Sequence, residues 1–542
     1  MASLSFAEIY EKICEGLNQL PPRPLLLKAL EKIEERISNK ENVLLFLEAP
    51  TGYGKTTLSL SLYAAIKAGR HDLGQRVIHV LPMRSIGTDM RQKMIDRIRK
   101  LREHGINLDE NDVGLQQMHS PGSPMLCKRF VITTLDTFIS CFYKMPAAEI
   151  SKIERYGTAH YEIPRACIYA SIVVFDEFHL YTSAKTLIDG QSKSLTATVS
   201  CIRSLFETGV PVVISTATMP NCVKNVVKQQ LELAGHGEKI DEITPSEHDR
   251  NFVRRNIRAS VYKGELTELL NTLRQHRRIL VLFNTVSHAV KNYLQLKSSG
   301  FEAILLHSRL IEKTKRERLA VLENGKRDNL ILVSTQVLEA GVDKSFDVLV
   351  TEAATPDSII QRAGRVARYG GDGYIFVTPI TADGRAIYGE KLPAQVYQYI
   401  SENRAIDQNM LGLIDESASD QLLDFSYKGL LQEVDSHPSY SVDYAQRVWR
   451  AVCGFVRDGE QVAVIPERYV QVDKRWDHLF CVDDEKFFNL YKQKIIQRAL
   501  FEDGEVRKLG RIDESRCLSE QFFRLGVVAV VLDEYDEEVG LS

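Results

Sequence analysis

The sequence predicts an α/β protein in which two tandem parallel-sheet domains precede a C-terminal accessory domain. Short apolar runs alternate with segments of helical periodicity, and this alternation is typical of βαβ units whose parallel sheets are covered on both faces. A polar stretch without periodicity at 235–250 interrupts the alternation, and beyond Pro379 the alternation weakens. The predicted domains are therefore residues 1–245, 246–384 and 385–542.

Composition and charge narrow the class of protein. At about 100–200 residues per domain, a chain of 542 residues fits three or four domains. Apolar residues make up 44% and charged residues 26%, which indicates a folded chain rather than a disordered one. The net charge of -3 gives no overall basic field, although it leaves a local basic groove open. The nine cysteines form no CxxC pair, so neither a zinc ribbon nor a disulfide scaffold is indicated.

No segment predicts membrane attachment or export. The longest uncharged stretches fall well short of the roughly 18 apolar residues that a membrane span needs. The first six residues lack the basic region and the apolar core of a signal peptide. We therefore expect a cytoplasmic protein without a membrane partner.

The first series of elements begins with two helices. Ile9, Ile13 and Leu17 recur at near-helical spacing before a proline-rich breaker, and a second helical stretch covers 25–37. Residues 42–47 then form an uncharged apolar run followed by glycines, which is typical of a buried parallel strand. Further strands are predicted at 77–81, 130–132, 172–175 and 212–214, and a helix is predicted at 90–101.

A second series of apolar runs follows the polar stretch. It predicts strands at 279–283, 303–306, 331–334, 348–350 and 374–377. The accessory domain contains helical and mixed segments and ends with a strand-like run at 526–532.

A phosphate-binding loop is predicted directly after the first strand. The loop matches GxxxxGK[ST] except that Ala49 stands at the first glycine position. Gly52 and Gly54 let backbone N–H groups point at a phosphate beside the positive end of the following helix. Lys55 is expected to reach the β- and γ-phosphates of ATP, and Thr56 is expected to bind Mg²⁺. The strand–loop–helix context disfavours the alternative, a turn with a surface lysine. The predicted nucleotide-binding residues of the loop are Thr51, Gly52, Gly54, Lys55, Thr56 and Thr57.

The acidic half of such a site follows a later buried strand. Four apolar residues at 172–175 deliver Asp176 and Glu177 to the carboxyl end of that strand, where ligands bind in open α/β sheets. Asp176 is predicted to hold Mg²⁺, and Glu177 is predicted to orient and deprotonate the attacking water. An apolar run ending in Asp-Glu is common by itself, but together with Lys55 it predicts a nucleoside triphosphatase.

The order of these and further motifs resembles that of the superfamily-two helicases. Residues 176–179 resemble their DExH box, and residues 215–218 resemble the motif that couples hydrolysis to domain movement. Residues 361–368, QRAGRVAR, resemble a motif of the second RecA-like domain, with Ala367 in place of the last glycine. The alternative for this segment is a solvated basic helix. The resemblance implies coupling roles for His179, Ser215, Thr216 and Thr218, and catalytic roles for Gln361, Arg365 and Arg368 at the γ-phosphate.

The same resemblance implies contacts with a nucleic-acid backbone. These fall on the segments after several predicted strands, where hydroxyls and amides suit phosphate contacts. The implied nucleic-acid-binding residues are Pro82, Arg84, Ser85, Thr133, Thr134, Asp136, Asn284, His307, Ser308, Arg309 and Thr335. The motif at 334–343 also implies nucleotide contacts for Gly341 and Asp343.

Within the superfamily, the chain is most similar to the CRISPR-associated type I interference helicase. The similarity includes the DExH phrase, QRAGRVAR, and a Tyr535-Asp536…Gly540-Leu541 phrase. It implies a motor that pulls single-stranded DNA 3′→5′ with ATP and Mg²⁺ after a guide-RNA surveillance complex has opened the target. A metal-dependent HD nuclease accompanies such motors. The two His-Asp pairs, at His71 and His248, fall in predicted solvated loops, so we expect the nuclease on a separate chain.

Three questions stay open at this level. Leu26 stands where many helicases have an adenine-reading glutamine, and Gln19 is badly placed for that role, so the choice of nucleotide is open. An RNA helicase or a DNA-repair helicase of the DExH type fits the same motifs. A nucleic-acid-dependent ATPase clamp without processive unwinding needs the same Lys55, Glu177 and Arg365.

Overall fold

The computed structural model of the protein divides into two units. Its described residues are 4–50, 52–82, 84–117, 120–146, 148–232, 235, 240–250, 255–273, 275–276, 278–323, 330–339, 344–437, 443–456 and 459–541. The first unit comprises Met1–Phe252 and Asp415–Arg457, and the second comprises Val253–Ile414 and Asp458–Ser542. None of the helices in these described ranges combines the length and the apolar character that crossing a membrane requires.

The first unit is built on an eight-stranded sheet in the order β4-β3-β5-β2-β6-β7-β1-β8. Neighbouring strands are parallel except for β3 and β4. β1 and β6 lie on either side of β7 and run parallel to it. The P-loop after β1 and the DExH segment after β6 therefore both leave the sheet at the carboxyl ends of its strands. The strands are β1 Leu44–Glu48, β2 Arg76–Leu81, β3 Val113–Gln117, β4 Ser120–Pro121, β5 Phe130–Thr134, β6 Ser171–Phe175, β7 Val212–Thr216 and β8 Ile240–Ile243.

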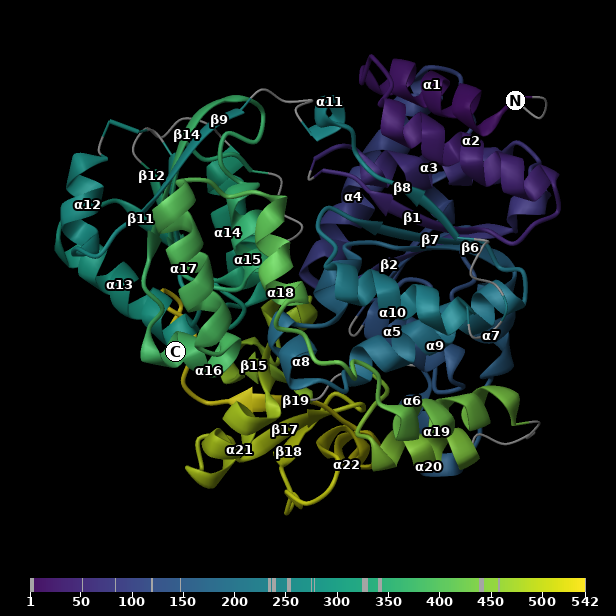
Figure 1. The fold of residues 1–542 in the computed structure, drawn as a ribbon. Helices are drawn as coiled ribbons and strands as arrows, with labels where there is room; N and C mark the ends of the chain where they lie inside the picture. Colours follow the sequence, from purple (N-terminus) through teal and green to yellow (C-terminus); the bar gives the residue numbers. More distant parts are fainter. Residues whose placement is uncertain are drawn as a thin grey trace. The chain divides into compact units, whose positions relative to one another are not determined.

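Helices cover both faces of this sheet, with α2 and α3 on one side and α9 and α10 on the other (Figure 1). Local sequence explains several helix starts: Ser5 and Glu8 form a capping box for α1, and Pro24 stands in the first turn of α2. The helices of this unit are α1 Phe6–Leu17, α2 Pro24–Ser38, α3 Lys55–Lys67, α4 Arg84–Glu103, α5 Leu135–Phe142, α6 Ile150–Tyr156, α7 Glu162–Tyr169, α8 Ala184–Asp189, α9 Lys193–Glu207, α10 Asn221–Glu232, α11 Glu247–Arg250, α19 Phe425–Ser436 and α20 Asp443–Ala451.

The second unit contains a six-stranded, all-parallel sheet in the order β11-β12-β10-β13-β14-β9. Successive residues of β10 enter different cores: Leu280 and Leu282 pack on one face, and Ile279 and Val281 pack on the other. Burial on both faces explains why these strands appear in the sequence as continuous apolar runs. The strands are β9 Arg255–Val261, β10 Arg278–Leu282, β11 Ala303–Leu306, β12 Leu330–Ser334, β13 Val348–Glu352 and β14 Gly371–Thr378.

A smaller five-stranded sheet completes the second unit, in the order β16-β15-β19-β17-β18. Only β15 and β19 are parallel within it. Its strands are β15 Gln461–Pro466, β16 Phe480–Asp483, β17 Arg498–Phe501, β18 Val506–Lys508 and β19 Val527–Leu532. The helices of the second unit are α12 Leu266–Thr272, α13 Val286–Ser298, α14 Glu312–Glu323, α15 Pro356–Ala363, α16 Ala382–Tyr388, α17 Lys391–Asn403, α21 Asp484–Lys492 and α22 Leu518–Leu525, and α18 Gly412–Asp415 ends at the boundary between the units.

The predicted accessory domain, 385–542, is divided between the two units. Val396, Ile400 and Met410 pack into the core of the six-stranded sheet. Asp435 of α19 instead accepts hydrogen bonds from Arg165 and Ser204 in the first unit. The division follows long-range packing, which the weak local periodicity of this region did not predict.

The strands that the sequence did not predict include edge strands. β8 (IDEI) and β9 (RNIRASV) carry charged residues because an edge strand is partly exposed to water. Both lie in or next to the polar stretch at 235–250, for which the sequence predicts no strand. The central strands β1, β2, β5, β6, β7, β10, β12, β13 and β14 and the edge strand β11 lie where predicted, with small differences at their ends.

Candidate active site

The P-loop has the backbone shape that its glycines allow. It connects the end of β1 at Glu48 to the start of α3 at Lys55. Gly52 and Gly54 adopt φ values of +82° and +100°, a region that favours glycine. Thr51, predicted to bind nucleotide, lies outside the described residues. The first N–H groups of α3 and the buried Lys55 therefore lie where an anion binds best.

Lys55 and the DExH glutamate form an ion pair. Lys55 Nζ lies 3.0 Å from Glu177 Oε1. Glu177 has φ and ψ of 48° and 48°, a left-handed conformation that is uncommon for a residue other than glycine. Such strain persists where the surrounding structure fixes the residue, and it clusters at functional sites. The predicted base and the predicted phosphate-binding lysine are thus in direct contact.

Asp176 is held by a histidine that the sequence analysis did not identify. His79 of β2 is fully buried, and its Nε2 lies 3.3 Å from Asp176 Oδ2. An ionised carboxylate only accepts hydrogen bonds, so Nε2 carries the proton that faces Asp176, and Nδ1 lies 2.9 Å from the Ser59 hydroxyl. Burial raises the pKa of Asp176, but the hydrogen bond from His79 and the charge of Lys55 outweigh burial and hold that pKa below its usual value. The one signal in the sequence is a histidine inside an apolar strand.

The site has polar atoms that fit a Mg²⁺–nucleotide complex. Asp176 Oδ1 and Glu177 Oε2 are buried and have no hydrogen-bond partner. Buried oxygens without partners are costly, so their presence at one place indicates a ligand. A carboxylate and the Thr56 hydroxyl are hard oxygen ligands of the kind that Mg²⁺ takes, and Lys55 provides a positive charge for phosphate. The residues present therefore fit ATP with Mg²⁺.

The predicted coupling residues lie together. Thr216 Oγ1 donates to Thr218 O at 2.7 Å, so His179 Nδ1 must be the donor in its 2.8 Å contact with Thr216 Oγ1. His179 Nδ1 also lies 3.7 Å from Glu177 Oε2. The DExH box is thereby connected to the segment after β7 through one threonine hydroxyl. Ser215, the fourth predicted residue, is buried in β7, and its hydroxyl has no hydrogen-bond partner.

The P-loop is also tied to the segment before the second unit. Tyr53 donates a short hydrogen bond to the carboxylate of Asp249. Asp249 in turn accepts from the backbone and hydroxyl of Ser246. We had predicted a solvated loop at His248-Asp249, and this is wrong for Asp249, which is buried. His71, the other predicted loop histidine, is exposed.

Leu26 stands in the structure at the position where many helicases have a glutamine that reads the adenine base. Leu26 is fully buried and lies under the loop, where a Cβ added at Gly54 would meet its Cδ1 at 3.7 Å. Gln19 Oε1 accepts from the Thr57 hydroxyl at 3.4 Å. Arg23 lies over the ring of Tyr53 at 5.6 Å.

The nucleic-acid contacts predicted in the first unit are only partly accessible. Thr133 is fully buried and its hydroxyl donates to Gln116 O, so the predicted phosphate contact through this hydroxyl is wrong. Thr134 is buried and donates to Thr137. Pro82 and Asp136 are half-buried, whereas the side chains of Arg84 and Ser85 lie outside the described part of the chain.

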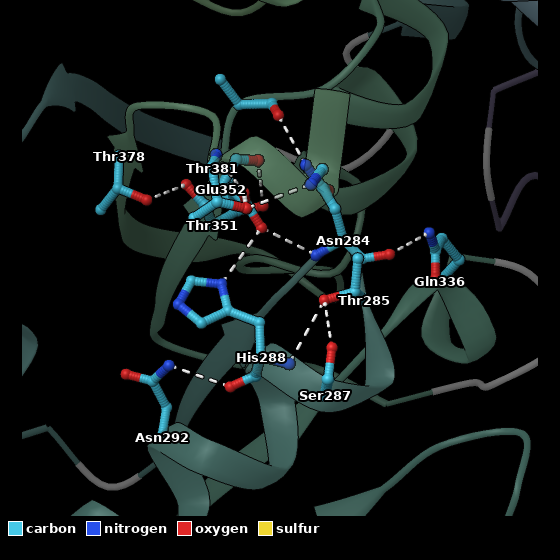
Figure 2. A network of polar contacts seen from close by, with 12 residues as sticks. Asn284, Thr285, Ser287, His288, Asn292, Gln336, Thr351, Glu352, Thr378 and Thr381 are labelled. Atoms are coloured by element: carbon cyan, nitrogen blue, oxygen red, sulfur yellow. Dashed lines mark hydrogen bonds and ion pairs between the residues drawn. The ribbon is translucent and has the colours of Figure 1, made fainter. Parts of the chain in front are cut away.

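In the second unit, Asn284 belongs to a buried polar network around Glu352 (Figure 2). The carboxylate of Glu352 accepts from the backbone N–H of Asn284 at 2.9 Å and from Thr381, and His288 lies 3.6 Å away. The Asn284 side chain donates to Ala353 O at 2.8 Å. With 1% exposure and both ends engaged, Asn284 cannot contact nucleic acid, which corrects the prediction.

The QRAGRVAR segment contains a structural arginine that the sequence analysis passed over. Arg362 is fully buried and donates to Glu339, Thr351 and Asn284 at 2.7–3.0 Å. Arg365 is also buried and donates to Glu339 O at 2.6 Å. The segment is therefore part of the core and not a solvated basic helix.

The other predicted residues of the second unit differ in exposure. Gln361 is buried, and Arg368 has its backbone N–H bound to Ser345. Thr335 is buried as well. Gly341 and Asp343 lie outside the described residues. Catalytic roles for Gln361, Arg365 and Arg368 stay predictions.

His307 is buried, whereas the two residues that follow it are more accessible. Its Nε2 lies 2.9 Å from Val539 O, and its Nδ1 accepts from the N–H of Arg309 at 3.2 Å. Burial lowers its pKa to about 4, so the ring is neutral. A direct contact of His307 with nucleic acid is therefore wrong. Ser308 is exposed and Arg309 is half-buried, so these two stay candidates.

Two family models match the chain. Residues 28–226 match the DEAD/DEAH box helicase model, and residues 275–371 match a model described as CRISPR-associated nuclease/helicase Cas3, C-terminal. The chain is 25% identical over 498 residues to a CRISPR-associated nuclease/helicase Cas3 of Methanothermobacter thermautotrophicus, covering 83% of this chain and 54% of the relative. It is 28% identical over 396 residues to the CRISPR-associated helicase Cas3 of Thermoproteus tenax, covering 71% and 63%. The chain thus spans between half and two thirds of these relatives.

Solved structures show the same fold. The T. fusca Cas3–AMPPNP structure aligns with a TM-score of 0.64 at 15% identity, covering 98% of this chain and 72% of the other. A chain of a CRISPR RNA-guided surveillance complex before nicking aligns with a TM-score of 0.60 at 15% identity, covering 98% and 69%. These alignments confirm the predicted α/β fold with two RecA-like parallel-sheet domains and a C-terminal accessory part, to which the structure assigns a five-stranded sheet.

Proposed function

We propose that this protein is a motor that uses ATP to move along single-stranded DNA in CRISPR type I interference. The match to the DEAD/DEAH box helicase model and the similarity to Cas3 helicases over most of the chain support this proposal. The observation that carries this proposal is the cluster of Lys55, Asp176 and Glu177. The three side chains lie at the carboxyl ends of parallel strands, where α/β proteins bind nucleotides, and this supports their proposed roles as phosphate-binding cation, metal-binding carboxylate and base.

Each residue has a separate task in this proposal. Lys55 and the N–H groups of α3 bind the phosphates, while His79 keeps Asp176 ionised and oriented. Glu177 accepts a proton from the attacking water. Mg²⁺, when bound, neutralises charge on the phosphates. Phosphate bound at Lys55 competes with the Glu177 carboxylate for the same ammonium group, which leaves that carboxylate free to bind water.

His179 connects this chemistry to movement. Its hydrogen bond to Thr216 reaches from the DExH box to the segment after β7. A change in Glu177 on hydrolysis is therefore passed to that segment through His179. Arg365 and Arg368 of the second domain, by the family resemblance, complete the site when the domains close.

We also propose the direction 3′→5′, and partnership with a guide-RNA surveillance complex and with an HD nuclease on a separate chain. The names of the relatives support a CRISPR role, and one similar structure is a surveillance complex. The two His-Asp pairs do not support a nuclease here: His71 is exposed, and the Asp249 carboxylate binds Tyr53 and Ser246.

ATP hydrolysis with and without nucleic acid tests the proposal. We expect single-stranded DNA to stimulate hydrolysis more than RNA of the same sequence, and a 3′-tailed duplex to be unwound in preference to a 5′-tailed one. Stimulation by RNA alone would indicate an RNA helicase. Strong stimulation by DNA without strand displacement or translocation would indicate a clamp, and either result would overturn the motor. Cleavage of DNA with Mg²⁺, Mn²⁺ or Ni²⁺ that persists in Lys55→Ala would overturn the proposal that the nuclease is on a separate chain.

A further inference from the structure

Residues 533–541, which we call the C-terminal strap, lie against residues 307–311, which we call the His307 loop. Both belong to the second unit. The strap follows β19 of the five-stranded sheet, and the His307 loop follows β11 of the six-stranded sheet. Figure 1 shows the end of the chain beside α13. The strap thus joins two sheets that are distant in sequence.

The shape of the strap is set by its own sequence. Asp536 Oδ1 accepts from the N–H groups of Glu538 and Val539 at 2.7 and 2.9 Å, which closes a turn. The N–H of Gly540 donates to Asp536 O at 2.9 Å, and Gly540 has φ +69°. The turn points the carbonyl of Val539 at the His307 loop.

Hydrogen bonds fix the His307 loop to the strap along its length. His307 Nε2 donates to Val539 O at 2.9 Å, and the N–H of Leu541 donates to Arg309 O at 3.4 Å. The N–H of Ile311 donates to the hydroxyl of Tyr535 at 3.0 Å. Because Nδ1 of His307 accepts from the N–H of Arg309, the ring connects the strap to the backbone on both sides of Ser308.

The neighbouring helices hold the strap in place. Arg318 of α14 donates to Leu305 O and to Glu538 O, both at 2.6 Å. Tyr293 of α13 donates to the carboxylate of Glu538 at 2.9 Å. Ile311 packs in the core of the five-stranded sheet. The loop is therefore clamped between two sheets.

The position of Gly540 leaves no room for a side chain. A Cβ there would lie 2.8 Å from Arg309 O and 3.1 Å from His307 Cε1. Because Arg309 O is a backbone atom, the strap and the His307 loop must move apart if Gly540 is replaced. A substitution at Gly540 thus disturbs the contact that the strap makes with the backbone beside Ser308 and Arg309.

We propose that the C-terminal strap is a positioning segment that presents Ser308 and Arg309 to the phosphates of the bound strand. This inference rests on the proposed function, in which the chain binds single-stranded DNA. A loop ordered before binding contributes its phosphate contacts without a further cost of ordering. His307, Gly540 and Tyr535 act through the loop and do not touch the strand.

The test compares two glycines of the full-length chain. Gly540→Ala separates the strap from the loop, whereas Gly300→Ala places a methyl group at φ +80° with nothing within 4 Å, so it is a matched control for backbone strain. We measure the affinity for a single-stranded oligo(dT) by fluorescence anisotropy, and ATP hydrolysis against the concentrations of ATP and of oligo(dT). Arg309→Ala is measured in parallel.

We expect Gly540→Ala and Arg309→Ala to weaken oligo(dT) binding by about tenfold, the scale of a lost phosphate-binding contact. For Gly540→Ala, the KM for ATP and hydrolysis without DNA should stay within about twofold of the wild type, because the nucleotide residues of the first unit are untouched. Gly300→Ala should bind oligo(dT) like the wild type. Hydrogen exchange in a peptide covering the His307 loop should be faster in Gly540→Ala than in Gly300→Ala.

The outcomes separate this inference from the proposed function. If the wild type binds oligo(dT) and Gly540→Ala binds it as Gly300→Ala does, the positioning role is overturned while the motor stands. If Arg309→Ala binds oligo(dT) with the wild-type affinity, the positioning role is overturned in the same way. If the wild type neither binds single-stranded DNA nor responds to it, the proposed function fails and takes the inference with it.

Discussion

His79 and Asp176, 97 residues apart, form a buried hydrogen-bonded pair whose side-chain atoms lie 3.3 Å from one another. β2 and β6 are neighbours in the sheet, with His79 opposite Val174 in the register, so the ring lies beside the end of β6 where the chain leaves the strand. The pair holds one carboxylate oxygen and leaves the other without a partner. This geometry supports the proposal that Asp176 binds a metal ion with His79 as its supporting histidine.

His79→Ala should raise the Mg²⁺ concentration needed for half-maximal ATP hydrolysis. Loss of a residue that supports a metal ligand costs about 10–100-fold in metal affinity or activity, and the pKa of Asp176 should rise as well. A Mg²⁺ titration of hydrolysis measures the effect. His71→Ala, at an exposed histidine of the same unit, is the control and should titrate like the wild type. An unchanged Mg²⁺ requirement in His79→Ala would contradict the assigned role.

Lys55→Ala and Glu177→Gln should separate nucleotide binding from turnover. Lys55→Ala removes the phosphate-binding cation, so the affinity for a fluorescent ATP analogue should fall by at least about tenfold. Glu177→Gln removes the base and also releases Lys55 from its ion pair, so affinity should be kept or rise while turnover falls by about 100-fold or more. Nucleotide titration and steady-state hydrolysis measure the two effects. Turnover within a few-fold of the wild type in Glu177→Gln would count against its role.

Arg365→Ala should resemble Glu177→Gln and not Lys55→Ala. If Arg365 acts in the closed transition state, nucleotide affinity is kept and kcat falls. Arg365 also donates to Glu339 O, so the thermal midpoint of the variant is measured alongside hydrolysis. A variant that loses nucleotide affinity together with kcat would show that the role in the transition state is wrong.

Arg362→Ala should destabilise the second unit. It leaves Glu339 as a buried charge without its partner, which costs about 3–5 kcal/mol in the free energy of unfolding. Burial already raises the pKa of Glu339 against the opposing effect of Arg362, so the unpaired carboxyl should take up a proton. Urea unfolding measures the loss. Arg316→Ala breaks an exposed pair with Asp477 and should cost about 1 kcal/mol or less. Equal losses in the two variants would contradict the structural role of Arg362.

His307 should make the second unit sensitive to mild acid. Burial lowers its pKa to about 4, and the nearby cations Arg318, Arg309 and Lys315 act in the same direction. In the unfolded chain this histidine takes up its proton near pH 6.5. The stability that the buried neutral ring contributes is therefore fully present above about pH 6.5 and is lost as the pH falls towards about 4. His307→Gln should lower the thermal midpoint at pH 7.5 but show a smaller further decrease by pH 5. Parallel decreases in both proteins would contradict this prediction.

Much of the fold and the nucleotide site could be predicted from the sequence, because both depend on local patterns. Apolar runs located the central strands, and glycines followed by Lys55 located the P-loop. The run at 172–175 carried Asp176 and Glu177 to the correct edge of the sheet. These predictions needed only the rule that parallel strands bring their carboxyl ends to one edge.

The identity of buried polar partners was decided only by the tertiary structure. His79 meets Asp176 because β2 pairs with β6, and the order of strands in a sheet is not written in any single segment. Thr133, Asn284 and His307 were predicted to face nucleic acid, yet they face inward. A side chain changes from one face of a strand to the other with each residue, and at strand ends the local pattern does not determine which face the chain follows.

What the sequence determined by itself was which chemical groups the protein has and near which strand ends they stand. What only the tertiary structure decided was which of these groups are used within the fold. Arg362 and Arg365 stand three residues apart in one motif, and both lie in the core: Arg362 donates to Glu339, Thr351 and Asn284, and Arg365 donates to the backbone oxygen of Glu339. The C-terminal strap reaches the His307 loop across more than two hundred residues. Such contacts depend on long-range packing, since a buried polar group must find a partner wherever the folded chain provides one.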